Sequence, residues 1–316
     1  MLRRLAALAA VTTLTVTGLA APAEAAATTA CTAESGSPRC QMWTGKVDWT
    51  PDGDTIRVDL AGDGAKNLVS VRILGIQAME MKTYSHHPER RKGDCHAVAA
   101  NVRLEQLIRA GGGTVRLTSL KAASKSEGRP LRSVAVKVGG QWRDVGEQLV
   151  REGHVLWQAW PGEWAMDGVY HRAAQEAAAA GRELYDTDSC RSGPAQSSGL
   201  TLTVNPDADG VDQENLNGEY FKIHNPSAAG VPIGGWWVRD SGLRRYTLPA
   251  GTVVPAGGDV HVHIGKGRNT ATHKYWGLTK PIFTNVDPAN HSVGDGGYLF
   301  DVHGDLRAWM IYPEVG

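Results

Sequence analysis

The sequence lacks a net charge, because its 33 Lys and Arg residues balance 33 Asp and Glu residues over 316 positions. Neither half is strongly basic, so any contact with nucleic acid must come from a local cluster, and tight non-specific coating of DNA is disfavoured. Cysteine is scarce, and no CxxC spacing occurs, so a thiolate metal or redox site is not expected. After residue 25, no run is apolar for long enough to span a bilayer, and no internal repeat is present.

The first residues are typical of a secretory signal peptide. Arg3 and Arg4 form a short basic region, residues 5–21 are apolar and small, and Ala23-Glu24-Ala25 fits a small-x-small cleavage site. We therefore expect residues 1–25 to be removed and the mature chain, which has no transmembrane segment, to be secreted. A retained membrane helix is the alternative interpretation.

Four cysteines remain in the mature chain, namely Cys31, Cys40, Cys95 and Cys190. In an oxidising compartment an even count favours two disulfide bonds. All four residues precede the last third of the chain, so the bonds are expected within the first domain alone. Three pairings are possible, and the sequence does not choose among them.

A segment rich in Ser, Gly and Pro, residues 189–199, predicts a linker between two domains. An N-terminal extension, residues 26–43, and a first domain, residues 44–188, precede it, and a second domain, residues 200–316, follows it. Hydrophobic periodicity in the first domain predicts strands over residues 45–49, 55–60, 68–74, 114–120 and 131–138, and helices over residues 95–108, 145–152 and 164–180.

These elements predict the fold class of each domain. Five strands with three helices inserted late are typical of an α+β domain built on a small barrel of the oligonucleotide-binding (OB) type. Beyond residue 200 the helix signals vanish, and short apolar runs alternate with Gly, Pro, Asn and Asp. That pattern predicts an all-β sandwich of the immunoglobulin-like type.

Two residues of the first domain suggest a site for a cation beside an anion. Asp54 follows the tight turn Asp52-Gly53, and an oxygen-only cluster there would suit calcium. The alternative for this turn is a plain hairpin. Arg72 lies inside an apolar strand, where an unpaired guanidinium is costly to bury, so it has either an acidic partner or an anion site.

Two further residues complete the parts needed to cut a phosphodiester. Glu80 opens a polar, basic loop over residues 81–93, where it could orient or deprotonate a water molecule, although a solvated loop is the alternative. Arg129 follows Gly128 at the start of a strand, and its forked guanidinium matches the oxygens of a phosphate. By itself such a residue is more often an arginine of a turn.

The order of these residues resembles the thermonuclease (staphylococcal-nuclease-like) family over residues 45–186. The matching pieces are Asp52-Gly53-Asp54-Thr55, Val71-Arg72-Ile73-Leu74-Gly75-Ile76, Glu80, Gly128-Arg129 and Leu149-Val150-Arg151-Glu152-Gly153-His154-Val155. The resemblance implies an OB-type barrel that cleaves DNA or RNA with calcium. It assigns Asp54 to the metal, Arg72 and Arg129 to the phosphate, and Glu80 to the attacking water.

The sequence departs from this family at two places. Gln77 stands where the family has a second acidic calcium ligand, so the metal set becomes Asp54, Gln77 and the main-chain carbonyl of Ala78, which should bind calcium more weakly. Ser126-Glu127 replaces a Lys-Tyr pair of some relatives and so removes a cation and a stacking ring. Trp157 and Trp160 offer either another stacking surface or core packing behind the barrel.

The second domain resembles a lamin tail domain over residues 199–312. The matching pieces are the segments 219–226, 234–240, 246–258 and 295–301. The resemblance implies an immunoglobulin-like module for anchoring or substrate binding. Asp207, Asp209 and Asp212 surround a glycine turn and suggest a second calcium site, with a plain Asp-rich turn as the equal alternative.

Together these features predict a secreted, monomeric hydrolase: a nuclease (phosphodiesterase) that cleaves DNA, RNA or both, with calcium as its cofactor and a C-terminal binding domain. The rival hypothesis is a catalytically inactive module that binds nucleic acid or a cell-envelope or matrix partner. The preference between DNA and RNA, the partner of the tail and the biological role stay open at this stage.

Overall fold

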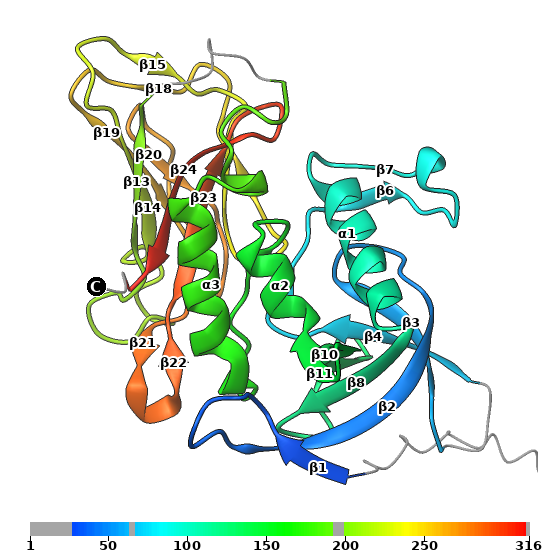
Figure 1. Ribbon diagram of the computed structural model, residues 1–316. Coiled ribbons are helices and arrows are strands. Elements are labelled where there is room, and N and C mark those ends of the chain that lie inside the picture. Colours follow the sequence, from blue (N-terminus) through cyan, green and yellow to red (C-terminus); the bar gives the residue numbers. More distant parts are fainter. Residues whose placement is uncertain (1–26, 63–66, 192–198, 314–316) are drawn as a thin grey trace, which may run out of the picture.

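The computed structural model describes residues 27–62, 67–191 and 199–313. The predicted signal peptide and most of the predicted linker lie outside the described residues. The chain forms two domains that pack side by side, an N-terminal barrel with helices and a C-terminal all-β sandwich (Figure 1). None of the described helices is long and apolar enough to cross a membrane.

The N-terminal domain is a closed barrel of five strands, as the sequence predicted. The strands are β2 (Arg39–Trp49), β3 (Thr55–Leu60), β4 (Leu68–Ile73), β8 (Thr114–Ser119) and β10 (Arg129–Val138). Their order around the barrel is β2-β3-β4-β10-β8, and β8 pairs with β2 to close it. Of the pairs between these five strands, β4 with β10 is parallel and the others are antiparallel. This closed five-strand arrangement is that of an OB-type fold.

Short elements extend the barrel. They are β1 (Ala27–Ala30), β5 (Ile76–Gln77), β6 (Met81–Thr83), β7 (Lys92–Gly93), β9 (Lys125–Ser126), β11 (Gln141–Asp144) and β12 (Leu156–Trp157), with the 3-10 turns η1 (Pro88–Arg90), η2 (Trp164–Met166) and η3 (Glu183–Tyr185). The predicted N-terminal extension pairs as β1 with the start of β2, and the Cys31–Cys40 disulfide joins the two strands.

Three helices cover the barrel: α1 (Ala97–Ala110), α2 (Val145–Arg151) and α3 (Asp167–Ala179). Helix α1 places Ala100, Leu104 and Leu107 on its buried face, the spacing that predicted it, and it ends at Gly111. Asp144 caps the start of helix α2, because its carboxylate accepts a hydrogen bond from the amide of Glu147 at 2.8 Å.

The C-terminal domain consists of two four-stranded sheets. One contains β13 (Thr201–Asn205), β14 (Tyr220–His224), β19 (Asp259–His263) and β20 (His273–Tyr275), and the other contains β17 (Tyr246–Thr247), β16 (Trp237–Asp240), β23 (Asp295–Phe300) and β24 (Leu306–Tyr312). Smaller elements are β15 (Val231–Pro232), β18 (Val253–Val254), β21 (Val286–Asp287), β22 (Ser292–Val293) and η5 (Pro288–Asn290). Two sheets facing one core form the predicted immunoglobulin-like sandwich.

The sheet β17-β16-β23-β24 is covered on both faces. In β23, Leu299 packs in the core of the sandwich, whereas Tyr298 and Phe300 belong to the core of the barrel domain. This division follows from the alternation of side chains along a strand. Helix α3 lies along this sheet, where Gln175 donates to the carbonyl of Ile311 at 3.3 Å (Figure 1). The two domains therefore share a buried apolar interface.

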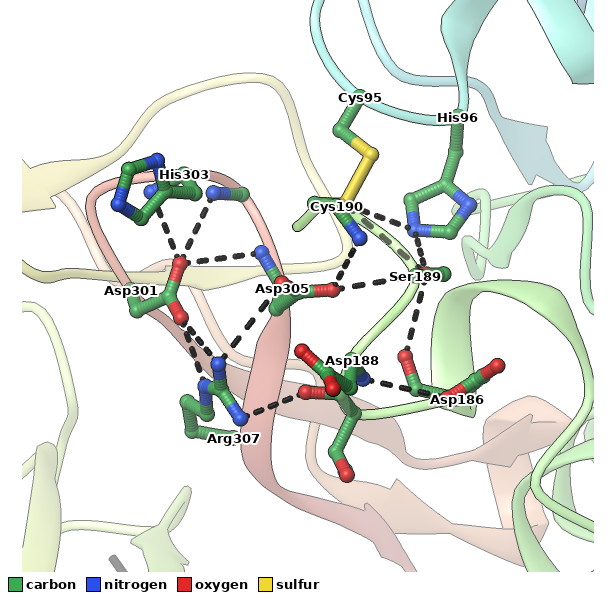
Figure 2. Close-up of a disulfide and its surroundings, with 12 residues drawn as sticks. Cys95, His96, Asp186, Asp188, Ser189, Cys190, Asp301, His303, Asp305 and Arg307 are labelled. Atoms are coloured by element: carbon green, nitrogen blue, oxygen red, sulfur yellow. Dashed lines mark hydrogen bonds and ion pairs between the residues drawn. A yellow bond between two sulfur atoms is a disulfide. The ribbon is translucent and has the colours of Figure 1, made fainter. Parts of the chain in front are cut away.

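A polar network also joins the domains, beside the Cys95–Cys190 disulfide (Figure 2). The amide of Cys190 donates to the Asp305 carboxylate at 2.6 Å. Arg307, which is almost fully buried, is ion-paired with Asp301 at 2.6 Å and donates to the carbonyl of Thr187 at 2.6 Å. The four cysteines form two disulfides, as predicted. The bonds were expected within the first domain alone, but Cys190 lies in the predicted linker and contacts the tail domain.

Candidate active site

The turn that precedes β3 is held against helix α1. A side chain at Gly53 would come within 2.8 Å of the β-carbons of Ala78 and Ala100, so the close approach requires glycine here. Asn101, fully buried on α1, donates through Nδ2 to the carbonyl of Asp52 at 3.0 Å. The position of Asp54 is therefore fixed by packing and by a buried amide.

Arg72 lies near the end of β4, opposite Thr55 of β3. Its side chain is buried, and Nη1 lies 3.1 Å from Oδ2 of Asp54. Nη1 also donates to the carbonyls of Asp54 and Ile73, both at 3.2 Å. Of the two alternatives that the sequence left open for this arginine, an acidic partner is the one observed.

The segment from β4 to Glu80 crosses the end of the barrel through a glycine turn. Gly75 has φ +78°, and a β-carbon there would meet the Tyr170 ring at 2.5 Å. Both facts require glycine. Strand β5 then pairs with β12, which places Gln77 opposite Leu156 and directs its side chain to Arg72.

Gln77 bridges the arginine and the two acids. Its Oε1 accepts from Arg72 Nη2 at 2.8 Å, and its Nε2 faces Oδ2 of Asp54 and Oε1 of Glu80, both at 3.4 Å. Because a guanidinium can only donate, Oε1 must point to Arg72 and Nε2 to the acids. The carbonyl of Ala78 also accepts from Nε2, at 3.2 Å. Three oxygens thus surround the amide nitrogen of Gln77.

Glu80 is the exposed acid of this cluster. Burial of its carboxyl group and the charge of Asp54 raise the pKa of Glu80, while Arg239 and Arg72 lower it. Its main-chain carbonyl accepts from the amide of Asp94 at 2.9 Å, which closes the hairpin of β6 and β7. Glu80 is thus accessible from outside while its backbone is held.

Arg129 reaches the cluster through Thr55. Its Nη1 donates to Oγ1 of Thr55 at 3.4 Å, and this hydroxyl donates to Oδ1 of Asp54 at 3.1 Å. Its Nη2 is ion-paired with Glu127 at 3.0 Å. Glu127, which stands where some relatives have a tyrosine, is therefore the acidic partner of this partly exposed arginine.

Two residues near the cluster were not assigned to it from the sequence. Burial of the carboxyl group and, after it, the charge of Asp54 raise the pKa of Asp52 to about 7. Tyr84 follows β6 and is half-exposed. Burial raises the pKa of its hydroxyl group, and the charges of Asp52 and Glu80 raise it further.

Trp157 is fully buried against His171, so it serves core packing rather than stacking.

The predicted second calcium site has a different arrangement. Asp207 and Asp212 both accept from Nδ2 of Asn285, at 3.3 and 2.9 Å. Among the residues that the structure describes, the one group of three His, Cys, Asp or Glu ligand atoms within 4.8 Å of one another is that of Cys95, His96 and Cys190. The three aspartates do not gather that closely, and both cysteines of the other group are in a disulfide.

A cavity of about 860 Å³ lies elsewhere on the barrel domain, between the β1–β2 connection and helices α2 and α3. Arg116, whose guanidinium lies 4.9 Å from the ring centre of Trp142, lines it together with Glu34 and Arg172. None of the predicted site residues borders this cavity. The cluster at Asp54 is therefore separate from this cavity.

Comparison with known proteins identifies the second domain. Residues 195–314 match the lamin tail domain family. This match covers the immunoglobulin-like sandwich and confirms the resemblance for that part of the chain. No nuclease family matches the barrel domain, and no curated protein matches the chain.

Proposed function

We propose that this protein is a secreted nuclease that hydrolyses phosphodiester bonds of DNA, RNA or both. The observation that carries the proposal is the joining of Asp54, Arg72, Gln77 and Glu80 into one hydrogen-bonded cluster at one end of an OB-type barrel. Arg129 is linked to this cluster through Thr55. Two guanidinium groups and an exposed acid beside a metal-type aspartate are the groups that such a hydrolysis needs.

In this proposal each side chain has a separate role. Glu80 accepts the proton of the attacking water, for which its exposed position is suited. Arg129, partly exposed, binds a non-bridging oxygen of the phosphate once it leaves Glu127. Arg72 stabilises the charge that develops on the phosphorus oxygens. Tyr84 offers a half-exposed ring on which a base can stack.

Calcium fits the donor set, which consists of oxygens. The carboxylate of Asp54, the carbonyl of Ala78 and the side-chain oxygen of Gln77 would hold the ion, next to the carboxylate of Glu80. When bound, the ion would polarise the phosphate and neutralise part of its charge. The side-chain amide of Gln77 would have to rotate, because its Nε2 now lies between the oxygens of Asp54, Ala78 and Glu80, where the ion would bind.

The lamin tail domain supports a role in binding or anchoring beside the catalytic domain. The two disulfides are the kind of bond that persists outside the cytosol and support an extracellular location.

One observation favours the rival function, a non-catalytic binding module. The ion pair between Arg72 and Asp54 and the bridge made by Gln77 satisfy the polar groups of the cluster without metal or substrate. For catalysis, a cation on Asp54 and a phosphate on Arg72 would have to replace this pair. A scaffold that only binds would keep it.

The deciding experiment is digestion of single- and double-stranded DNA and of RNA, with calcium and then with chelator. We expect cleavage by the natural chain and a loss of at least about 100-fold in Arg72→Ala and Glu80→Ala, as is typical for a removed catalytic group. Arg143→Ala, an exposed arginine of β11, is the matched control and should cleave normally. Equal cleavage by all four proteins would indicate a contaminant and refute the proposal.

A further inference from the structure

Arg239 of the tail domain is a buried charge at the boundary with the barrel. In β16 the side chains alternate, so that Val238 enters the sandwich core while Trp237 packs in the core of the barrel domain. Arg239 lies on the same face as Trp237 and is 3 % exposed. Its Nη1 lies 3.8 Å from Sδ of Met79, the residue before Glu80.

The guanidinium of Arg239 has only neutral partners at close range. Nε donates to the carbonyl of Asp240 at 3.1 Å, and Nη2 donates to the carbonyl of Ser241 at 3.2 Å. Among the described residues, no carboxylate oxygen lies within 4.0 Å of it. A buried cation without an ion pair is costly. The charges of Asp240 and Glu80 attract this guanidinium at longer range.

A second arginine of the tail contacts the other strand of the hairpin that carries Glu80. Arg245 lies with its guanidinium 4.8 Å from the ring centre of Trp237 and 3.9 Å from a carboxylate oxygen of Asp94. Asp94 is the residue whose amide donates to the carbonyl of Glu80 at 2.9 Å. Its carboxylate also binds Lys82 at 2.5 Å.

The two contacts therefore bracket Glu80. Arg239 touches the residue before it in the chain, and Arg245 touches the residue hydrogen-bonded to its carbonyl. Both arginines come from the segment 239–245 of the tail domain. Glu80 is held by the hydrogen bonds from Gln77 and Asp94 and by its chain neighbour Met79. The tail domain contacts two of these three residues, Asp94 and Met79.

We propose that the lamin tail domain is a working part of the candidate active site, in which Arg239 and Arg245 are positioning residues that hold the Glu80 hairpin in place for attack on the phosphate. This inference rests on the proposed nuclease function. It predicts that hydrolysis needs both domains, and that the tail does more than anchor the enzyme. Neither arginine touches the reacting atoms.

The test uses the full chain with Arg239→Met, which keeps much of the side-chain volume and removes the positive charge and the N–H donors of the guanidinium. We expect kcat to fall about tenfold or more with KM changed less than about twofold, because a displaced base slows the chemical step and leaves substrate binding intact. Arg239→Lys keeps the charge and should restore part of kcat. Arg245→Ala, at an exposed residue, should lower kcat in the same manner by about threefold.

Arg307→Met is the matched control, because Arg307 is also a buried arginine of the tail at the domain boundary, yet it binds Asp301 and Thr187 rather than the Glu80 hairpin. It should lower the melting temperature and leave kcat unchanged below that temperature. A normal kcat in folded Arg239→Met and Arg245→Ala, or an equal loss of kcat in Arg307→Met, would overturn the inference. If Arg239→Met does not fold, Arg239→Lys and Arg245→Ala decide by the same criterion.

A readout without catalysis separates this inference from the proposed function. Hydrogen exchange of the Asp94 amide, which reports the bond to the Glu80 carbonyl, should become at least about tenfold faster in Arg239→Met and Arg245→Ala and stay unchanged in Arg307→Met. If Glu80→Ala cleaves normally, the proposed function fails while the exchange result still stands. If Glu80→Ala is inactive but both tail variants match the natural chain in kcat and exchange, the inference alone fails.

Discussion

Gln77 offers the most direct test of the site, because one atom decides what the cluster can bind. Its Nε2 faces Oδ2 of Asp54 and Oε1 of Glu80 at 3.4 Å each. The isosteric change Gln77→Glu keeps an acceptor for Arg72 and puts a carboxylate oxygen in place of the donor. Two attractive contacts then become two repulsive ones.

The size of the effect follows from these distances. Like charges at about 4 Å repel by roughly 1 to 4 kcal/mol, depending on how far water screens them. With two such pairs, partly offset by Arg72, we expect the free energy of unfolding in chelator to fall by about 2 to 4 kcal/mol. A divalent cation removes the repulsion, so the variant should bind calcium at least about tenfold more tightly, which corresponds to about 1.4 kcal/mol.

Two measurements check this expectation without any need for activity. Titration calorimetry gives the Kd for calcium, and melting with calcium or chelator gives the stabilisation that binding adds to the folded state. Gln148→Glu is the matched control, since the Gln148 amide also donates to a carboxylate, that of Glu152 at 3.1 Å, on helix α2. An unchanged Kd in Gln77→Glu, or the same calcium response in Gln148→Glu, would refute the assignment of this cluster as a cation site.

Two other variants test the surroundings. Tyr84→Ala should raise KM for single-stranded oligonucleotides by at least about fivefold, since stacking of a base contributes roughly 1 to 3 kcal/mol, and should leave kcat within about twofold in steady-state assays. Burial raises the pKa of Asp144 from 3.8 to about 6, so the folded chain holds a proton that the unfolded chain releases, and the free energy of unfolding falls as the pH rises through this window. Asp144→Asn keeps the acceptor for Glu147 and should abolish this decline of about 3 kcal/mol; equal urea-unfolding profiles of both proteins between pH 4 and 7 would contradict it.

Much of the fold could be predicted from local patterns. Alternation of apolar residues located β3 and β4, and helical spacing followed by glycine located α1, because these features depend on near neighbours in the chain. The strand β1 was missed, since its four small or polar residues give no periodic signal. The predicted start of the barrel domain, residue 44, falls inside β2, which pairs with both β1 and β8.

The site was predictable in its members but not in its contacts. A familiar order of residues pointed to Asp54, Arg72 and Glu80, yet the orientation of the Gln77 amide depends on where Arg72 lies in space. Arg239 could not be found in this way, because the sequence around it predicts an ordinary strand and its contact with Met79 spans 160 positions of the chain. Contacts between residues so far apart produce no pattern in the local sequence.

The doubly covered sheet has a consequence for how the protein is made. The face of α3 that meets β24 is complete when residue 179 has been synthesised, whereas the strand that covers it ends at Tyr312. If the barrel domain folds first, its apolar flank is open to water until the tail domain has folded against it. Such an interval invites chaperone binding, and a prematurely ended chain would keep that flank uncovered for its whole lifetime.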